Sequence, residues 1–320
     1  MNAKKDLNVS FYKKMYMIRV SEEQIQKHYH EDEMKTPTHM SMGAEAIAVG
    51  VCSALKETDQ VFGTYRSHAL YLAKTADIDD FFAEMYGKAT ALLKGKGGSM
   101  HLCAPRYGFM ITSAIVASNI PVGVGAAFAN KYLDNQKMVV VFFGDGAVDE
   151  GAFWESLNAA CLMKIPILFI YEDNGYAVHS STTQRHGYLS ITEIVKKFNC
   201  LVKSSYTTDV EEIYDLTLNS LSEINKTEQP AFLHLKYYRY LEHVGVFEDF
   251  KVGYRDRAEF EKWKMRDPVI LQRDKLIKLG FSENELLHIE KEINDKISQC
   301  IANAKRAPFA DETELHKELY

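Results

Sequence analysis

A single acidic residue, Asp145, stands directly after the apolar run 139–143 and between two glycines. The next apolar run, 165–171, also ends in a polar cluster, which contains Asn174. The two residues are about 30 positions apart, the length of one strand–helix–strand crossover, so both are expected at the same edge of a parallel sheet. A carboxylate and an amide oxygen are ligands that Mg²⁺ accepts, usually beside phosphate oxygens of a substrate. The spacing therefore predicts a site for Mg²⁺ and a diphosphate.

The same two residues also allow a purely structural interpretation. Asp145 can cap the helix expected over 150–163, and Asn174 can close an Asx turn with its own backbone. A lone carboxylate at the end of a core strand is costly unless something compensates its charge. Two polar groups at matched strand ends therefore favour the ligand site over the structural interpretation.

The order of the expected elements indicates an α/β fold. Apolar strands alternate with helices, which is typical of a doubly wound, mostly parallel sheet with helices on both faces. We predict this domain over residues 1–255, including an N-terminal helix, and a helical C-terminal extension packed on it over 256–320. The expected strands are 138–143, 165–171, 200–206 and 231–239, with a short strand and turn in 61–74, and the expected helices are 8–34, 44–55, 120–133, 150–163, 191–198 and 209–224.

Composition narrows the class of protein. The 320 residues carry a net charge of −6, whereas a nucleic-acid surface would need a basic excess. No apolar run approaches the roughly 18 residues of a membrane span, and the N-terminus lacks a signal-peptide pattern. The five cysteines are scattered and form no CxxC pair, so we expect free thiols in a cytoplasmic protein.

A glycine- and lysine-rich segment, 85–109, is expected to be a long functional loop. Its stretch KGKGGS lacks the GxxxxGK[ST] pattern and the preceding strand of a P-loop. Its glycines are expected to let the loop approach a ligand or a neighbouring subunit closely. The small residues of helix 120–133 likewise suit close helix contacts, either internal or across subunits.

Several motifs together resemble a known family. They are GTYRSH, KGKGGSMHL, GDGAVDEGAFWESLNAA and IYEDNGYAV. GDG followed by an asparagine about 30 residues later is similar to the thiamine diphosphate motif. The wider set resembles the α subunit of the E1 component of 2-oxoacid dehydrogenase complexes, over about residues 10–270. The resemblance implies a thiamine diphosphate-binding fold with thiamine diphosphate and Mg²⁺ as cofactors.

The resemblance implies roles for the residues at the two strand ends. Asp145 and the side chain of Asn174 would bind Mg²⁺, with the backbone carbonyl of Tyr176 as a third ligand. Gly146 and Ala147 would contact the diphosphate through their backbone.

Further cofactor contacts are implied before the first of these strands. Tyr65 and Arg66 would hold the diphosphate oxygens, which suits a guanidinium because its planar fork stays charged and binds two oxygens. A surface salt bridge is the structural alternative for Arg66. Ala114 and Val116 would meet the aminopyrimidine through their backbone. The family commonly has a glycine where Ala114 stands, so that contact requires a conformation that accepts a Cβ.

Three histidines are implied to form the catalytic set. His39 and His243 match family histidines near the reacting carbon, where they would orient substrate and stabilise or move charge. That task suits a group that titrates near neutral pH, and His243 would also contact the cofactor. His68 matches the histidine of YRxH and would support the site from behind. A structural role is the alternative for each of them.

The resemblance also implies a partner. In this family the glutamate that activates thiamine diphosphate lies on the E1 β subunit, so the chain would carry half an active site within an α₂β₂ heterotetramer. The implied reaction is oxidative decarboxylation of a 2-oxoacid, with pyruvate favoured and transfer to the lipoyl domain of an E2 acyltransferase. Cleavage of acetoin or oxidation of a branched-chain 2-oxoacid are the alternatives within the family.

One segment departs from the family pattern. The family's pyruvate enzymes commonly read HGHSxSDP, whereas this chain reads LEHVGVFEDFKVGYR, with no Ser or Thr between His243 and Arg257. Serine phosphorylation is therefore not expected there, and the change fits an unusual substrate or an acceptor other than lipoate. Two other classes stay open: a non-catalytic scaffold subunit that binds Mg²⁺ and diphosphate, and a self-sufficient thiamine enzyme. The short chain argues against the second.

Overall fold

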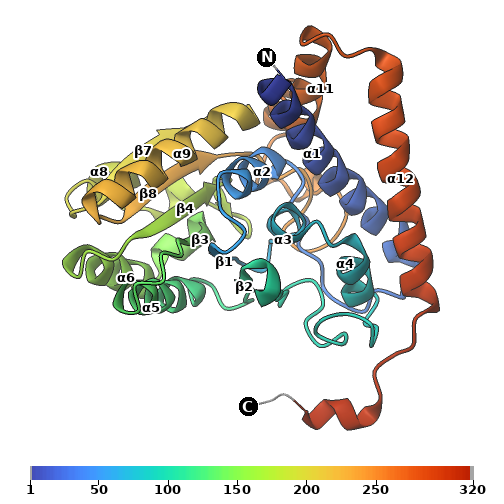
Figure 1. The fold of residues 1–320 in the computed structure, drawn as a ribbon, viewed down its shortest axis with the longest axis horizontal. Coiled ribbons are helices and arrows are strands. Elements are labelled where there is room, and N and C mark those ends of the chain that lie inside the picture. The colour runs from blue at the N-terminus through green and yellow to red at the C-terminus, as the bar shows by residue number, and fades with distance from the viewer. Residues whose placement is uncertain (1, 318–320) are drawn as a thin grey trace.

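The computed structural model describes residues 2–317, and at its centre lies a six-stranded parallel sheet. The strand order is β2–β1–β3–β4–β8–β7, so β1 lies next to the edge strand β2, and the later strands extend the sheet on the other side of β1 (Figure 1). A separate antiparallel hairpin joins β5 and β6. The strands are β1 (Gln60–Phe62), β2 (Phe109–Ile111), β3 (Val139–Gly144), β4 (Ile167–Asp173), β5 (Tyr176–Ala177), β6 (Ser180–Ser181), β7 (Leu201–Ser205) and β8 (Ala231–Lys236).

Helices cover both faces of the sheet, which confirms the predicted doubly wound α/β fold (Figure 1). Helices α5 and α6 pack on one face, and α2, α3 and α9 lie on the other. The helices are α1 (Asn2–His28), α2 (Glu45–Ser53), α3 (His68–Thr75), α4 (Ile78–Met85), α5 (Asn119–Tyr132), α6 (Gly151–Leu162), α7 (Thr182–Arg185), α8 (Ile191–Val195), α9 (Val210–Thr227), α10 (Arg257–Lys264), α11 (Pro268–Lys278) and α12 (Glu283–Arg306).

The central strands are apolar on both sides because each side belongs to a different core. In β3, Val139, Val141 and Phe143 pack into the cluster under α5 and α6. Val140 and Phe142 belong to the larger cluster on the opposite face. Successive side chains of a strand point to opposite faces, so a run without polar residues is what two helical layers require.

Some predicted elements were wrong in detail. The first helix ends at His28, not at residue 34, and Asp32 then adopts a left-handed conformation with φ of 56°. The segment 85–109 is a loop as expected, but strand β2 begins at its last residue and was missed. The stretch predicted as loop up to residue 190 contains the β5–β6 hairpin and the short helix α7.

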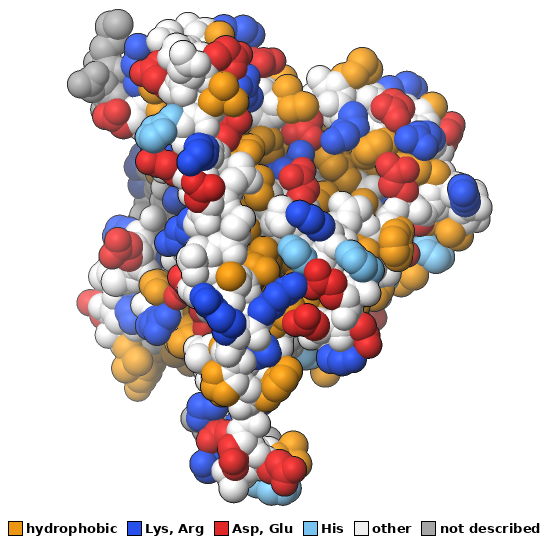
Figure 2. All heavy atoms as spheres, turned by 90° about the vertical axis from the view of Figure 1, so that its right-hand side faces the viewer, with side chains coloured by type: hydrophobic (Ala, Val, Ile, Leu, Met, Phe, Trp, Pro, Cys, Tyr) orange, Lys and Arg blue, Asp and Glu red, His pale blue; other side chains and the backbone are white. Residues whose placement is uncertain are grey.

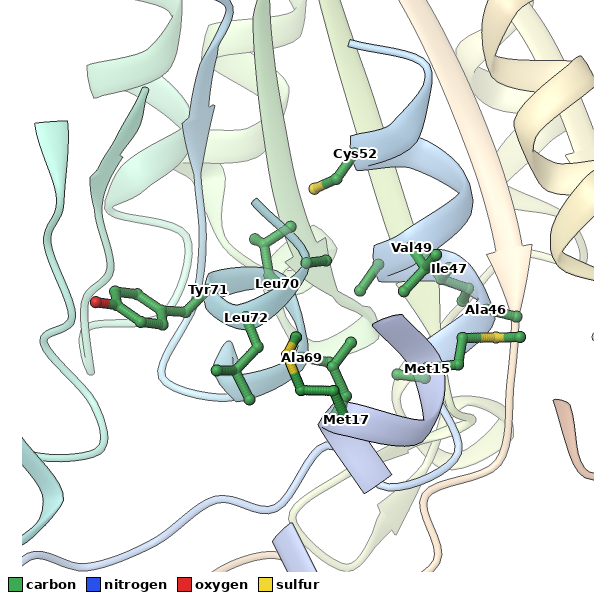
Figure 3. Close-up of a cluster of buried hydrophobic side chains, with 14 of the residues drawn as sticks. Met15, Met17, Ala46, Ile47, Val49, Cys52, Ala69, Leu70, Tyr71 and Leu72 are labelled. Carbon is green, nitrogen blue, oxygen red and sulfur yellow. The ribbon is translucent and has the colours of Figure 1, made fainter. Parts of the chain in front are cut away.

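A helical layer built from both ends of the chain covers α2 and α3. Met15 and Met17 of α1 point into a buried cluster formed with α2 and α3 (Figure 3). Helix α12 runs beside α1 and also contacts α4 (Figure 1). The outer face of α12 carries intermixed acidic and basic side chains, as a solvent-facing helix does (Figure 2).

A buried ion network ties this layer to the chain near the site. Arg19 of α1 donates to Glu45 of α2 over 2.6 Å and to Asp267, which caps α11, over 2.9 Å. Asp267 also accepts a hydrogen bond of 3.0 Å from the hydroxyl of Tyr240. Tyr240 lies three residues before His243, so the network fixes the segment that delivers this histidine.

The predicted division into residues 1–255 and 256–320 stays a prediction. Met1 and the last three residues, 318–320, lie outside the part of the chain that the structure describes. None of the helices in the described part combines the length and apolar character that a bilayer crossing requires.

Candidate functional site

A cavity of 280 Å³ lies at the carboxyl ends of β3 and β4. The two strands are hydrogen-bonded neighbours, and Gly144 of β3 pairs with Glu172 of β4. The strand adjacency inferred from the spacing of Asp145 and Asn174 is therefore confirmed. Nine of the predicted residues line this cavity: Tyr65, Arg66, Val116, Asp145, Gly146, Ala147, Asn174, Tyr176 and His243. Ala114, His39 and His68 do not line it.

Asp145 is 1% exposed at the floor of the cavity. Burial raises the pKa of its carboxyl to about 6, although the nearby guanidinium of Arg185 opposes this shift. The carboxylate forms an ion pair with that guanidinium. No side chain caps the 3-10 turn that starts at Asp145 or helix α6 after it. The capping role considered for Asp145 is therefore wrong, and the partner of its carboxylate is instead the cationic side chain of Arg185.

Asn174 closes the Asx turn that the structural interpretation expected. Its side-chain oxygen accepts a hydrogen bond of 3.1 Å from the backbone N–H of Tyr176. Its side-chain nitrogen donates to the hydroxyl of Tyr237 over 3.3 Å, which holds the amide in place. An amide oxygen has two lone pairs, so the turn leaves one acceptor position of Asn174 open to a ligand.

Two arginines and His243 form a basic cluster on the cavity wall. Arg66 donates to the backbone oxygens of Met40 over 2.7 Å and of His243 over 2.8 Å. Arg66 and Arg239 each place a guanidinium nitrogen 3.3 Å from Nδ1 of His243. Among the described residues Arg66 pairs with no carboxylate, so the surface salt bridge considered for it is absent, and its charge suits an anion in the cavity.

The two guanidiniums also determine the protonation of His243. A guanidinium can only donate, so Nδ1 of His243 must accept and the proton of the neutral ring must lie on Nε2. Burial and the charges of Arg66 and Arg239 lower the pKa of His243 to about 3. The ring is therefore neutral at pH 7, and the expectation of titration near neutral pH does not hold for this arrangement.

His39 lies behind the cavity wall with its ring against Tyr65 and His243. The ring centroids are 4.5 Å from Tyr65 and 5.3 Å from His243. Burial and the charge of Arg66 lower the pKa of His39 to about 3. Its Nδ1 is buried and has no hydrogen-bond partner among the described residues. A buried polar atom without a partner is uncommon.

His68 is fully buried and holds the backbone around His39. Its Nδ1 lies 3.1 Å from Glu22, and its Nε2 lies 2.7 Å from the hydroxyl of Ser99. The same hydroxyl accepts a hydrogen bond of 3.4 Å from the backbone N–H of His39. The carboxylate of Glu22 also accepts a hydrogen bond of 2.6 Å from the backbone N–H of Ser41. These contacts fit the supporting position expected for His68.

The alanine that stands where the family commonly has glycine causes no strain. Ala114 is not among the described residues with positive φ, so its Cβ is tolerated. Its neighbours Ser113 and Ile115 line the cavity, and Val116 is 42% exposed there. A left-handed conformation occurs instead at Ala117, where φ is 63°.

The loop after His243, whose sequence differs from the family pattern, is held in place by the buried side chain of Asp249. Asp249 accepts a hydrogen bond from the hydroxyl of Tyr254 and another of 2.7 Å from Arg255. Arg255 also donates to the backbone oxygen of Leu241 over 3.0 Å. Tyr254 in turn accepts a hydrogen bond from Arg239 on the cavity wall. The loop therefore orders the basic cluster without the serines of the family pattern.

Three residues that lie at the site were not predicted as site residues from the sequence. Arg239 stands four residues before His243, but nothing in its spacing marks it as a cavity residue. Glu172 lines the cavity, and burial raises its pKa to about 8 against the opposing charge of Arg66. Arg185 ends α7, a helix of 4 residues that is too short to give a periodic signal in the sequence. No group of three or more His, Cys, Asp or Glu gathers as a metal cluster in residues 2–317.

The fold and the site define a doubly wound α/β protein with a buried acid and a basic cluster at the carboxyl ends of its strands. Comparison with known proteins is more specific. The family model described as dehydrogenase E1 component matches residues 13–313, and this chain belongs to that family. Membership implies dependence on thiamine diphosphate, and α subunits of this family pair with β subunits.

Three relatives illustrate the match. Subunit alpha of the pyruvate dehydrogenase E1 component from Zymomonas mobilis is 31% identical over 313 residues, which are 97% of this chain and 88% of the relative. The corresponding protein from Rhizobium meliloti is 31% identical, over 98% of this chain and 90% of the relative. The alpha subunit of acetoin:2,6-dichlorophenolindophenol oxidoreductase from Bacillus subtilis is 29% identical, over 97% and 92%. The chain is thus an α subunit of an oxidoreductase of the E1 type.

The low pKa of His39 predicts a pH dependence of stability. The folded state keeps this ring neutral, whereas the unfolded chain binds a proton once the pH falls below the usual value of 6.5. Stability is therefore lost as the pH falls from 6.5 towards the folded pKa of about 3. His39→Gln is expected to reduce the loss between pH 7 and pH 4 by roughly 2 kcal/mol, measured by urea unfolding across that range. His288→Gln, on the exposed face of α12, should leave the slope unchanged, and an equal slope for His39→Gln would contradict the prediction.

Proposed function

We propose that this chain is the α subunit of a 2-oxoacid dehydrogenase E1 enzyme, with pyruvate as the favoured substrate. One observation carries the proposal. Asp145, Asn174, Arg66 and His243 come from distant parts of an E1-family chain and face a single cavity at the strand ends. A buried acid, an amide oxygen and unpaired arginine charge form a donor set suited to a metal–diphosphate group.

The cofactor site proposed here uses the chain's own residues as follows. Asp145, the side chain of Asn174 and the backbone carbonyl of Tyr176 would hold Mg²⁺. When bound, thiamine diphosphate would supply the carbanion chemistry that a 2-oxoacid decarboxylation requires. A Cβ placed on Gly146 would lie 3.1 Å from the Cβ of Ala177, so a side chain would be crowded at this position of the cavity wall. Remaining contacts to the cofactor are proposed for Tyr65, Arg66, Ala114, Val116, Ala147 and His243.

The basic cluster would position a substrate as well as the cofactor. Because Nδ1 of His243 accepts from two arginines, its Nε2–H is the donor left for a carbonyl or carboxylate oxygen. His39 offers a second neutral ring beside it. We propose that His39 and His243 orient the substrate by hydrogen bonding, and that His68 holds His39 in place.

A β subunit is the proposed partner, in an α₂β₂ heterotetramer whose β chain completes the active site. The outer faces of α5 and α6 support an apolar partner surface. Phe128 and Tyr132 of α5 stack with centroids 6.3 Å apart, although both are exposed. Leu162 at the end of α6 is 78% exposed. A lipoyl domain of an E2 acyltransferase as acceptor, and a cytoplasmic location consistent with five free thiols, belong to the same proposal.

A second candidate substrate is acetoin. The relative from Bacillus subtilis is named for acetoin and covers as much of this chain as the pyruvate relatives do. The loop after His243 also lacks the serines of the family's pyruvate enzymes. A branched-chain 2-oxoacid is the third candidate, and an acceptor other than lipoate is compatible with the same loop.

The test is turnover by the chain co-purified with the β subunit encoded beside it. The assay contains thiamine diphosphate, Mg²⁺ and an artificial electron acceptor, with pyruvate, acetoin and branched-chain 2-oxoacids as separate substrates. We expect turnover that requires both chains and is fastest with pyruvate. Fastest turnover of acetoin would replace the substrate assignment. No turnover of any of them, together with no cofactor binding, would refute the proposed function.

A further inference from the structure

Arg185 contacts the carboxylate of Asp145, which is one of the proposed metal ligands. Its guanidinium forms ion pairs with the carboxylates of Asp145 and Asp149. It also lies 3.5 Å from the backbone oxygen of Asp145, and its Nε donates to the backbone oxygen of Ser180 over 3.2 Å. The side chain is only 15% exposed. This guanidinium is largely buried and contacts several acceptors, which distinguishes it from a solvated surface ion pair.

This contact and a metal ion compete for the same carboxylate. Mg²⁺ requires near-ideal octahedral geometry with ligand oxygens at about 2.0–2.1 Å. The guanidinium of Arg185 contacts Oδ2 of Asp145, so it competes with a metal for that oxygen, and two cations repel each other strongly at a buried site. A metal bound through this oxygen therefore requires Arg185 to move away.

Arg185 is the last residue of α7, a short helix that lies outside the central sheet. The β5–β6 hairpin and α7 follow Asn174 and are closed by their own contacts, including a capping box between Ser181 and Gln184. Beyond Arg185, the ring of His186 lies 3.1 Å from an Asp149 oxygen without the alignment of a hydrogen bond. The ion pairs of Arg185 with Asp145 and Asp149 therefore hold the end of α7 at the floor of the cavity.

We propose that Arg185 is a resident counter-ion of the metal site, which holds Asp145 until Mg²⁺ and the diphosphate arrive and which their binding must displace. The proposal rests on the proposed function, because it concerns the same site. Arg185 then lowers the apparent affinity for the metal and cofactor, since only the fraction of molecules with Arg185 released is competent to bind. It also stabilises the buried charge of Asp145 in the protein that awaits its cofactor.

A tryptophan close to residues 185–188 provides a readout that is independent of activity. His186 stacks on Tyr188 with ring centroids 4.7 Å apart, and Tyr188 meets Trp154 of α6 at 6.5 Å. The chain has only one other tryptophan, Trp263, which packs against Arg266 of the C-terminal part. In a Trp263→Phe background, emission therefore reports on Trp154 and on any displacement of the neighbouring residues 185–188.

The test compares Arg185→Gln with the unsubstituted full chain, co-purified with its β subunit. Binding of thiamine diphosphate is measured by calorimetry at several fixed Mg²⁺ concentrations. We expect Arg185→Gln to bind at least about tenfold more tightly, because no internal cation competes. We also expect Trp154 emission of Arg185→Gln to resemble, before any addition, that of the unsubstituted protein with cofactor.

Two further variants complete the design. Arg185→Lys keeps a charge but loses the two-oxygen fork, so an intermediate affinity is expected. Arg106→Gln breaks an Arg–Asp pair of 3.0 Å with Asp77 away from the cavity and should change neither readout. Unchanged or weaker binding by Arg185→Gln, while the unsubstituted protein binds normally, overturns this inference alone. If neither protein binds the cofactor in the presence of Mg²⁺, the proposed function fails and this inference fails with it.

Discussion

Replacing Asp145 by asparagine is expected to weaken Mg²⁺-dependent binding of thiamine diphosphate by at least about 100-fold. The substitution keeps the shape of the side chain but removes the only carboxylate among the three proposed metal ligands. Binding is measured by calorimetry on the co-purified α and β chains at saturating Mg²⁺. The loss should be smaller in the absence of Mg²⁺, because the diphosphate contacts of Arg66 do not depend on Asp145.

The same variant is expected to be no less stable than the unsubstituted protein. Burial raises the pKa of Asp145 to about 6, so its charged form is less favourable in the folded state than in the unfolded chain. A neutral side chain avoids that cost, and Arg185 retains its partner Asp149. Loss of binding without loss of stability distinguishes a functional acid from a structural one.

Asp149→Asn is the matched control for this prediction. Asp149 pairs with the same guanidinium but is about a third exposed and was not assigned to the metal. We expect its cofactor affinity to stay within about threefold of the original or to rise, because Arg185 is held less firmly. Normal Mg²⁺-dependent binding by Asp145→Asn would show that the metal, if bound, lies elsewhere.

Local sequence pattern was sufficient to predict the sheet and the two residues at its edge. Strands β3 and β4 are apolar runs that are followed by polar residues. The carboxyl ends of adjacent parallel strands lie at the same edge of the sheet, so Asp145 and Asn174 could be predicted to lie close together. The Asx turn at Asn174 follows from the residue type. Strand β2 could not be predicted, because it has only three residues and is stabilised by pairing with β1.

The electrostatic state of the site depends on packing that sequence patterns do not encode. Arg239 reaches Nδ1 of His243 only because the loop after it is held by Asp249 and Arg255. The low pKa of His243 follows from that packing, so a histidine expected to titrate near pH 7 is neutral instead. Arg185 contacts Asp145 from the end of α7, which follows the β5–β6 hairpin. The hairpin lacks any periodic pattern in the sequence from which this contact could be predicted.

Replacing His243 by asparagine is expected to lower turnover by about 10²–10⁴-fold while thiamine diphosphate still binds. The oxygen of the shorter amide can still accept from Arg66 and Arg239, so the basic cluster keeps its arrangement. The donor at the position of Nε2 is lost, and with it the proposed hydrogen bond to the substrate. The measurement is steady-state kinetics of the co-purified α and β chains, with cofactor affinity determined separately.

The division of the effect between kcat and KM shows what the lost donor does. A fall in kcat with little change in KM indicates an interaction that forms in the transition state, whereas a rise in KM alone indicates uniform substrate binding. His288→Asn, an exposed change on α12, should leave both constants as they are. His243→Gln, whose amide nitrogen reaches further, should recover part of the turnover if donation from the Nε2 position matters. Unchanged turnover of His243→Asn would contradict the catalytic assignment and favour a subunit that binds the cofactor without taking part in the reaction.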